Sequence, residues 1–125
     1  MIKILVEHKK DHVQIHPNGQ KIYNLTPHPI TVNGVTFPPS GKVARVAEEG
    51  GTELAFPPFT IKRIRTGKVV DLPPRKEGTW YIVSRPVALA AIGREDLLVP
   101  DDFVRDEEGK IIGARRFAIF EKEVR

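Results

Sequence analysis

Residues 30–37 read Ile-Thr-Val-Asn-Gly-Val-Thr-Phe, and this stretch decides the fold class. Two triplets rich in β-branched residues flank Asn33-Gly34, and an Asn-Gly pair adopts the positive φ angles that a tight two-residue hairpin requires. β-Branched residues on both sides of such a pair are typical of paired strands. The segment therefore predicts an antiparallel hairpin.

The same kind of pattern extends in both directions along the chain. Residues 2–7 and 12–16 alternate apolar and polar side chains, and a Pro-Asn-Gly-Gln turn at 17–20 leads into a returning strand at 21–25. Further strands are predicted over residues 42–47, 59–65, 68–72, 80–83, 111–112 and 116–120. Residues 66–67, Thr-Gly, are expected to form a hairpin turn, and residues 48–51 a loop.

One segment favours a helix. Residues 87–92, Val-Ala-Leu-Ala-Ala-Ile, follow Pro86 and precede Gly93, and Ser84 stands where an N-cap is expected. Residues 94–98 can add a further turn before Pro100. The sequence thus predicts a mainly β fold at the margin of α+β: a small barrel, a rolled sheet or a sandwich of antiparallel hairpins, with one short helix near 86–92.

Length and composition set the class of protein. A chain of 125 residues forms one domain, 1–125, and the absence of cysteine excludes disulfides, cysteine zinc sites and thiol catalysis. The longest apolar run, residues 87–92, is too short for a membrane span, and the N-terminus lacks the pattern of a secretory signal, so we expect a cytoplasmic protein. Eleven prolines with one methionine favour a heat-adapted source.

The charge is unevenly placed along the chain. The net charge is +4, but residues 51–85 carry seven basic and three acidic groups, whereas residues 86–125 carry seven and nine. A basic middle beside an acidic tail can attract a polyanion, and it can equally pair with a second copy of the chain. Prolyl pairs at 38–39, 57–58 and 73–74 each follow a large apolar residue and are predicted to be stiff strand ends that prevent edge pairing.

Two segments could carry chemistry. His28 stands between Pro27 and Pro29, a stiff setting from which an imidazole could act as a general base, although a histidine that only satisfies a backbone carbonyl is favoured. Ser84 lies where a strand meets the helix and could seat an anion or simply cap the helix.

Charged candidates are more dispersed. Asp96 could serve an acid–base role but is expected to form a local ion pair with Arg94, and Asp101-Asp102 and Asp106 are expected in solvated loops. The histidines at 8, 12 and 16 do not have the geometry of a shared ligand set on strands, so we predict no metal site and no cofactor. Around the expected turn at 66–67, four basic residues form a candidate nucleic-acid contact: Lys62, Arg63, Arg65 and Lys68.

Several short strings occur in a distinctive order: Asn-Leu-Thr-Pro-His-Pro-Ile at 24–30, Pro-Ser-Gly at 39–41, Ala-Arg-Val at 44–46, Tyr-Ile-Val-Ser at 81–84, and Arg105-Asp106 before Gly109. In these strings the chain resembles a family of small proteins from bacteriophage, prophage and bacterial genomes that start near an "NLTPH" string. The resemblance covers about residues 22–117, which makes residues 21–120 the family-like core and 1–20 an added hairpin.

The resemblance implies a phage-type accessory protein without an assigned reaction. Ala114 stands where relatives often have cysteine, so no thiol role carries over. Through its matching strings the resemblance singles out six positions: Thr26, His28, Arg45, Ser84, Arg94 and Asp96.

Three functions follow as hypotheses. The favoured one is a non-enzymatic β-rich binding or assembly module that self-associates. The alternative is an enzyme or a pocket for a small phosphorylated ligand, with His28 as base, Ser84 as anion seat and Arg45 or Arg94 as clamp. The third is nucleic-acid binding through residues 62–68.

Overall fold

The computed structural model of the chain describes residues 3–123 and confirms a mainly β fold with one short helix. The elements are β1 (Leu5–His8), β2 (Val13–His16), β3 (Gln20–Asn24), β4 (Ile30–Val32), β5 (Val35–Phe37), β6 (Arg45–Glu49), β7 (Glu53–Phe56), β8 (Phe59–Lys62), β9 (Arg65–Val70), β10 (Thr79–Ile82), α1 (Arg85–Ala90), β11 (Leu97–Arg105) and β12 (Ile111–Ala118).

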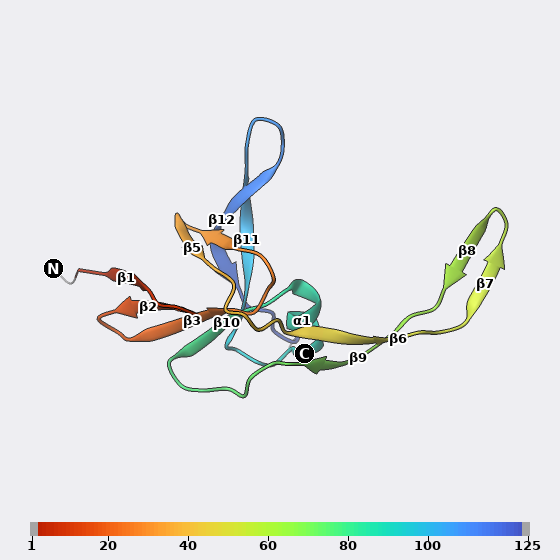
Figure 1. Cartoon of the computed structure of the whole chain (residues 1–125), viewed down its shortest axis with the longest axis horizontal. Coiled ribbons are helices and arrows are strands. Elements are labelled where there is room, and N and C mark those ends of the chain that lie inside the picture. The colour runs from red at the N-terminus through yellow and green to blue at the C-terminus, as the bar shows by residue number, and fades with distance from the viewer. Residues whose placement is uncertain (1–2, 124–125) are drawn as a thin grey trace.

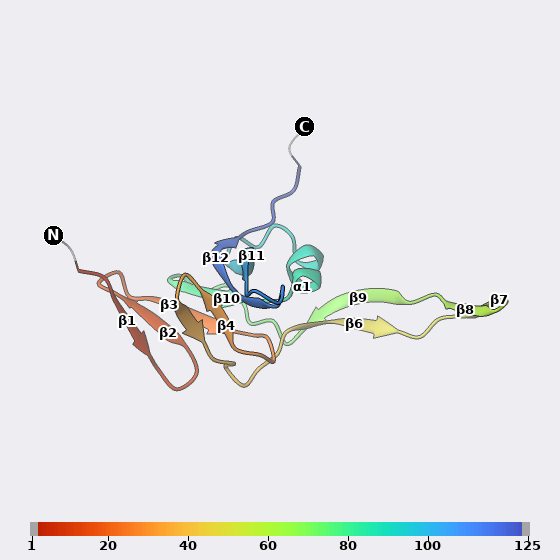
Figure 2. The ribbon, with the colours of Figure 1, turned by 90° about the horizontal axis from the view of Figure 1, so that it is seen from above.

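Eight of the strands form one sheet in the order β1-β2-β3-β10-β11-β12-β4-β5, which curls into a half-barrel (Figures 1 and 2). The curl brings its two edges together, because His8 Nε2 in β1 lies 3.0 Å from the carbonyl oxygen of Thr36 in β5. Both predicted Asn-Gly hairpins are confirmed, β2–β3 and β4–β5, and Asn33 and Gly34 have the positive φ angles that their turn requires.

The predicted antiparallel hairpins are joined by parallel pairings, which the sequence did not predict. β10 runs parallel to both β3 and β11, and β12 runs parallel to β4. The chain leaves β10 through α1 and returns as β11, a crossover that parallel neighbours need.

Strand β11 is the largest element that the sequence did not predict. Its first residues, Leu97 and Leu98, were expected in a helical turn, and Asp101-Asp102 in a loop. Pro100 is tolerated within β11 because β10 pairs only with Leu97 and Leu98, so that beyond them β12 is the one neighbouring strand.

The sheet is covered on both faces. One cluster lies inside the curl: Val13, Val32, Phe37, Ile82, Leu98 and Ala114. The other lies on the face that α1 covers: Leu25, Ala44, Tyr81, Val83, Val87, Ala88, Leu97 and Val99. Because successive residues of β10 alternate between the two clusters, residues 80–83 are apolar without alternation, as the sequence predicts for a strand buried on both faces.

Helix α1 begins at Arg85, and Ser84 occupies the N-cap position in extended conformation. The Ser84 carbonyl accepts the Ala88 N–H at 3.0 Å, but the Ser84 hydroxyl makes no capping hydrogen bond. The helix is held by packing, since Val87 and Ala88 are buried. Within residues 3–123 no helix has the length and apolar character to cross a bilayer.

Residues 45–70 form a long two-stranded extension, called the arm below, which projects from the body (Figures 1 and 2). β6 pairs with β9 at its base, and β7 pairs with β8 at its end. The predicted turn at 66–67 is therefore wrong, because Thr66 lies within β9 opposite Glu48, and residues 48–49, expected as a loop, belong to β6. Gly67 sits where the β6–β9 register shifts, which is the setting of a β-bulge rather than of a turn.

Candidate functional site

The side chain of Asn24, rather than the imidazole of His28, organises residues 24–30. Asn24 Nδ2 donates to the carbonyl oxygens of His28 and Phe37, each at 2.8 Å. Asn24 Oδ1 accepts from the Thr26 N–H at 2.9 Å and from Thr26 Oγ1 at 2.7 Å. Asn24 is 1% exposed, and these four bonds use the full capacity of its amide.

His28 contributes its backbone to this network. Its carbonyl oxygen accepts from Asn24 and also from Thr26 Oγ1 at 3.1 Å, while the residue itself is exposed. The flanking prolines restrict the backbone of this segment, which keeps that carbonyl where two side chains can reach it. Thr26 and His28 therefore have a structural role in the turn that links β3 to β4.

The residues of the enzymatic hypothesis are not gathered in one cavity. His28 and Ser84 line none of five hollows found among residues 3–123, and both residues are exposed. Arg45 lies at the base of the arm, where its Nη2 is 4.0 Å from Asp71 Oδ2.

Arg94 and Asp96 form the expected ion pair, in bidentate geometry. Arg94 Nε donates to Asp96 Oδ1 and Arg94 Nη2 donates to Asp96 Oδ2, each at 2.8 Å. Arg94 Nη2 also donates to the carbonyl oxygen of Pro73 at 3.0 Å. The guanidinium thus ties the loop after α1 to the segment that leaves the arm, and Asp96 is buried beneath it.

Burial by itself would raise the pKa of the Asp96 carboxyl. The hydrogen bonds and the positive charge of Arg94 outweigh this effect and hold that pKa below its ordinary value. The ionised form of Asp96 is therefore the one that the folded state stabilises.

We expect this pair to make unfolding acid-dependent. The pKa of Asp96 is lower in the folded chain than in the unfolded chain. The ionised carboxylate therefore stabilises the fold fully at pH values above the unfolded pKa of about 3.9, and this stabilisation is lost as the pH falls through the folded pKa. Urea denaturation at a series of pH values should show that the free energy of unfolding decreases less with falling pH for Asp96→Asn than for the unmodified chain. Asp101→Asn, which removes an exposed carboxylate bonded to Arg116 at 2.8 Å, is the control. An equal effect of the two variants would contradict this assignment.

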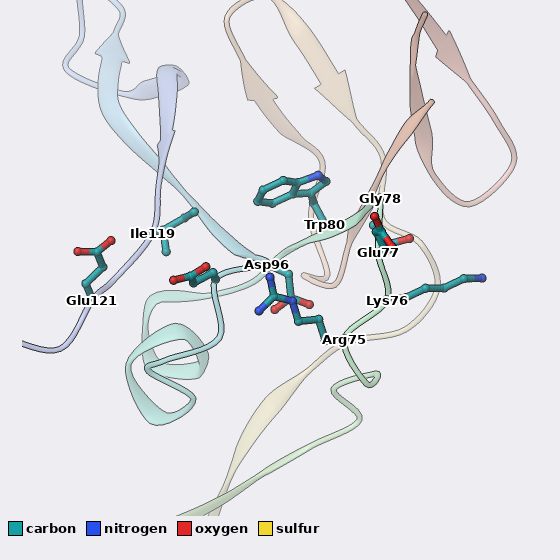
Figure 3. Close-up of a pocket in the computed structure, with 10 residues that line it drawn as sticks. Arg75, Lys76, Glu77, Gly78, Trp80, Asp96, Ile119 and Glu121 are labelled. Atoms are coloured by element: carbon teal, nitrogen blue, oxygen red, sulfur yellow. The ribbon is translucent and has the colours of Figure 1, made fainter. Parts of the chain in front are cut away.

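A hollow of about 350 Å³ lies beside this pair, lined by residues 75–80, 95–96, Ile119 and Glu121 (Figure 3). Two of its polar side chains have partners within the chain: Trp80 Nε1 donates to Gln20 Oε1 at 2.7 Å, and Asp96 accepts from Arg94. The lining mixes two basic with four acidic side chains, which does not suit a phosphorylated ligand. Among residues 3–123 no cluster of three or more histidine or acidic side chains could hold a metal ion.

The basic segment lies on the returning limb of the arm and not around a hairpin tip. Lys62, Arg63, Arg65 and Lys68 are all exposed. In the strand register Lys62 stands opposite Glu53, and Arg65 stands opposite Glu49. Facing carboxylates therefore offset about half of this positive charge.

The arm is anchored at its base and free beyond it. Val46, Val69 and Leu72 pack against the cluster that includes α1. Every residue from 48 to 68 is exposed. The outer part of the arm therefore contributes no buried residue to the core of the body.

The end of the arm carries an uncovered apolar face. Leu54 pairs with Ile61 and Phe56 pairs with Phe59, and residues two apart in a strand share a face. All four side chains therefore point to one side of the β7–β8 ribbon, and we call them the arm-tip face. They are 42–64% exposed, and the two phenylalanine rings stack with centroids 6.4 Å apart.

Sequence reasoning missed this face, although a signal for it exists. Residues 54–61 read Leu-Ala-Phe-Pro-Pro-Phe-Thr-Ile, so apolar residues alternate symmetrically about Pro57-Pro58. The pattern parallels that of residues 30–37 about Asn33-Gly34. The second prolyl pair was predicted to be a strand end, whereas it forms the turn of this hairpin.

The chain was also compared with models of protein families, with curated proteins and with solved structures, and it matches none of them. The function proposed below therefore rests on the residues and their geometry.

Proposed function

We propose that this chain is a non-enzymatic assembly module in which the arm of one copy binds another copy. The observation that carries the proposal is the arm-tip face. A two-stranded ribbon is marginally stable in water without a covered apolar face, and a cluster of exposed large apolar side chains marks an interaction surface. Burying one phenylalanine side chain is worth about 1.5–3 kcal/mol, so that covering the face provides a substantial driving force.

The candidate catalytic residues support a non-enzymatic role. Thr26 and the backbone of His28 belong to the Asn24 network, and Arg94 and Asp96 bond to each other. We further propose that the protein is a phage or prophage accessory protein of the host cytoplasm, from a heat-adapted source. These assignments rest on the resemblance of residues 22–117 and on composition.

Nucleic-acid binding remains a second candidate because four basic side chains are exposed on one limb of the arm. The glutamates opposite Lys62 and Arg65 favour the assembly function over it. The two candidates differ in one measurable respect: binding of an oligonucleotide weakens steeply with salt and depends on Lys62 and Arg63, whereas self-association requires the apolar face.

Sedimentation velocity of the unmodified chain over a wide range of concentration tests the proposal. We expect the weight-average sedimentation coefficient to rise with concentration. A monomer at every concentration, at low and at high salt, would contradict self-association. Oligonucleotide binding that Lys62→Glu with Arg63→Glu abolishes, in a chain that stays monomeric, would favour the second candidate instead.

The joint between the two halves of the arm offers a further prediction. A Cβ atom at Gly51 would collide with the carbonyl oxygen of Arg63, whereas a Cβ atom at Gly50 would meet nothing within 4 Å. Gly51→Ala should therefore redirect β7–β8 and weaken self-association about tenfold or more, since strain of this kind costs about 1–3 kcal/mol. Gly50→Ala is the matched control. Equal dissociation constants for both variants in sedimentation runs would show that the direction of the arm is unimportant.

A further inference from the structure

A second apolar surface lies on the body, where the β11–β12 hairpin meets β4. A hollow of about 160 Å³ is found there, and its apolar lining includes Pro29, Pro100, Phe103, Ile111 and Ile112. The side chains of Phe103, Ile111 and Ile112 are 45%, 45% and 56% exposed. Like the arm-tip face, this surface has no covering element among residues 3–123.

The size of the hollow suits one aromatic ring, because a protein cavity of about 150 Å³ holds benzene. We propose that a phenylalanine ring of the arm-tip face, Phe56 or Phe59, docks into this hollow of a second copy. This inference rests on the proposed function and specifies the acceptor for the arm.

Charge complementarity supports a second copy as the occupant. Of the four basic side chains in residues 62–68, Arg63 and Lys68 have no carboxylate opposite them in the strand register, whereas residues 101–108 contain five acidic and one basic side chain. On the acceptor, Asp101 and Asp102 already contact Arg116 and Arg115. Glu107 and Glu108, both exposed, remain at the end of the β11–β12 hairpin to face the basic limb of an arriving arm.

The arm of the same chain is not the occupant. In both overall views the end of the arm lies well away from the β11–β12 hairpin (Figures 1 and 2). The donor and acceptor surfaces differ, so this contact is compatible with two copies that exchange arms about a two-fold axis, and with a contact that repeats from copy to copy into a ring or a filament.

Cysteine cross-linking tests the acceptor directly, since the chain has no cysteine of its own. Phe56→Cys and Ile112→Cys are prepared separately, mixed and oxidised mildly. We expect a disulfide-linked dimer that contains one copy of each variant. The matched control replaces Ile112→Cys with Leu89→Cys, an exposed position on α1, and should yield no such dimer.

Two results would overturn the docking mode. One is efficient linkage of Phe56→Cys to itself, which would place arm against arm, and the other is linkage to Leu89→Cys as efficient as linkage to Ile112→Cys.

A variant without cross-linking separates this inference from the proposed function. Phe103→Asp with Ile112→Asp should weaken self-association at least about tenfold, while circular dichroism shows an unchanged fold because both side chains are exposed. If the unmodified chain associates and this variant associates equally well, the acceptor is wrong but assembly through the arm stands. If the unmodified chain is monomeric throughout, both fail.

Discussion

Changing Phe56 and Phe59 together to aspartate should abolish self-association and leave the body of the protein folded. The two rings stack on the arm-tip face, and the arm beyond residue 48 makes no core contact, so that their loss removes binding surface without opening a cavity. Two rings worth about 1.5–3 kcal/mol each correspond to a dissociation constant raised at least about 100-fold. Sedimentation velocity measures the association, and thermal unfolding followed by circular dichroism measures the fold.

Leu89→Asp is the control for this prediction. Leu89 is 53% exposed and lies on α1, away from the arm-tip face, so its change introduces the same charge without touching the proposed contact. Its dissociation constant should stay within about threefold of that of the unmodified chain. If Leu89→Asp disrupts association as strongly as the phenylalanine pair, the apolar face of the arm has no special role.

Asn24→Ala should be among the most destabilising single substitutions in the protein. It would leave the carbonyl of Phe37 and the N–H of Thr26 without their side-chain partner in a buried site, and would remove one of the two donors to the carbonyl of His28. Each unsatisfied buried group costs about 1–3 kcal/mol, so we expect a loss of about 3–5 kcal/mol in the free energy of unfolding. Urea denaturation at neutral pH measures it.

Two controls make this prediction specific. Asn18 is exposed and its Oδ1 accepts one backbone N–H at 3.1 Å, so Asn18→Ala should cost less than about 1 kcal/mol. His28→Ala should also cost little, because the network uses the carbonyl of His28, which alanine retains. If Asn24→Ala lowers the free energy of unfolding no more than Asn18→Ala does, the claim that the Asn24 amide stabilises this part of the fold is wrong.

Local chemistry was sufficient to predict the elements whose geometry is set by neighbouring residues. The Asn-Gly pairs at 18–19 and 33–34 produced the expected hairpins, and Pro86 lies in the first turn of the helix as predicted, although the helix ends at Ala90, before Gly93. The same reasoning anticipated the Arg94–Asp96 pair, whose members lie two residues apart. These features are determined by residues that lie close together in the sequence.

Pairing between distant segments could not be predicted in the same way. Pro100 indicated the end of an element, but it lies within β11. Only β12 pairs with β11 at this position, so the missing N–H of the proline leaves no second strand without a donor. Gly67 indicated a turn, but its strand continues because β6 lies across from it. In each case the deciding factor is the neighbouring strand, which a local pattern does not contain.

The candidate site differed from expectation for a related reason. Thr26, Arg94 and Asp96 carry side chains common in active sites, yet each is hydrogen-bonded to another side chain of the fold. The arm-tip face consists of ordinary apolar residues, and only the register of β7 against β8 shows that they share one exposed side.

Hydrogen–deuterium exchange of the unmodified chain at low and high concentration tests most directly whether a second copy covers the arm. We expect backbone amides of residues 53–62 to exchange more slowly as concentration rises, while those of β10, already buried, stay unchanged. Exchange of residues 53–62 that is equally fast at every concentration would contradict the claim that this arm joins one molecule to the next.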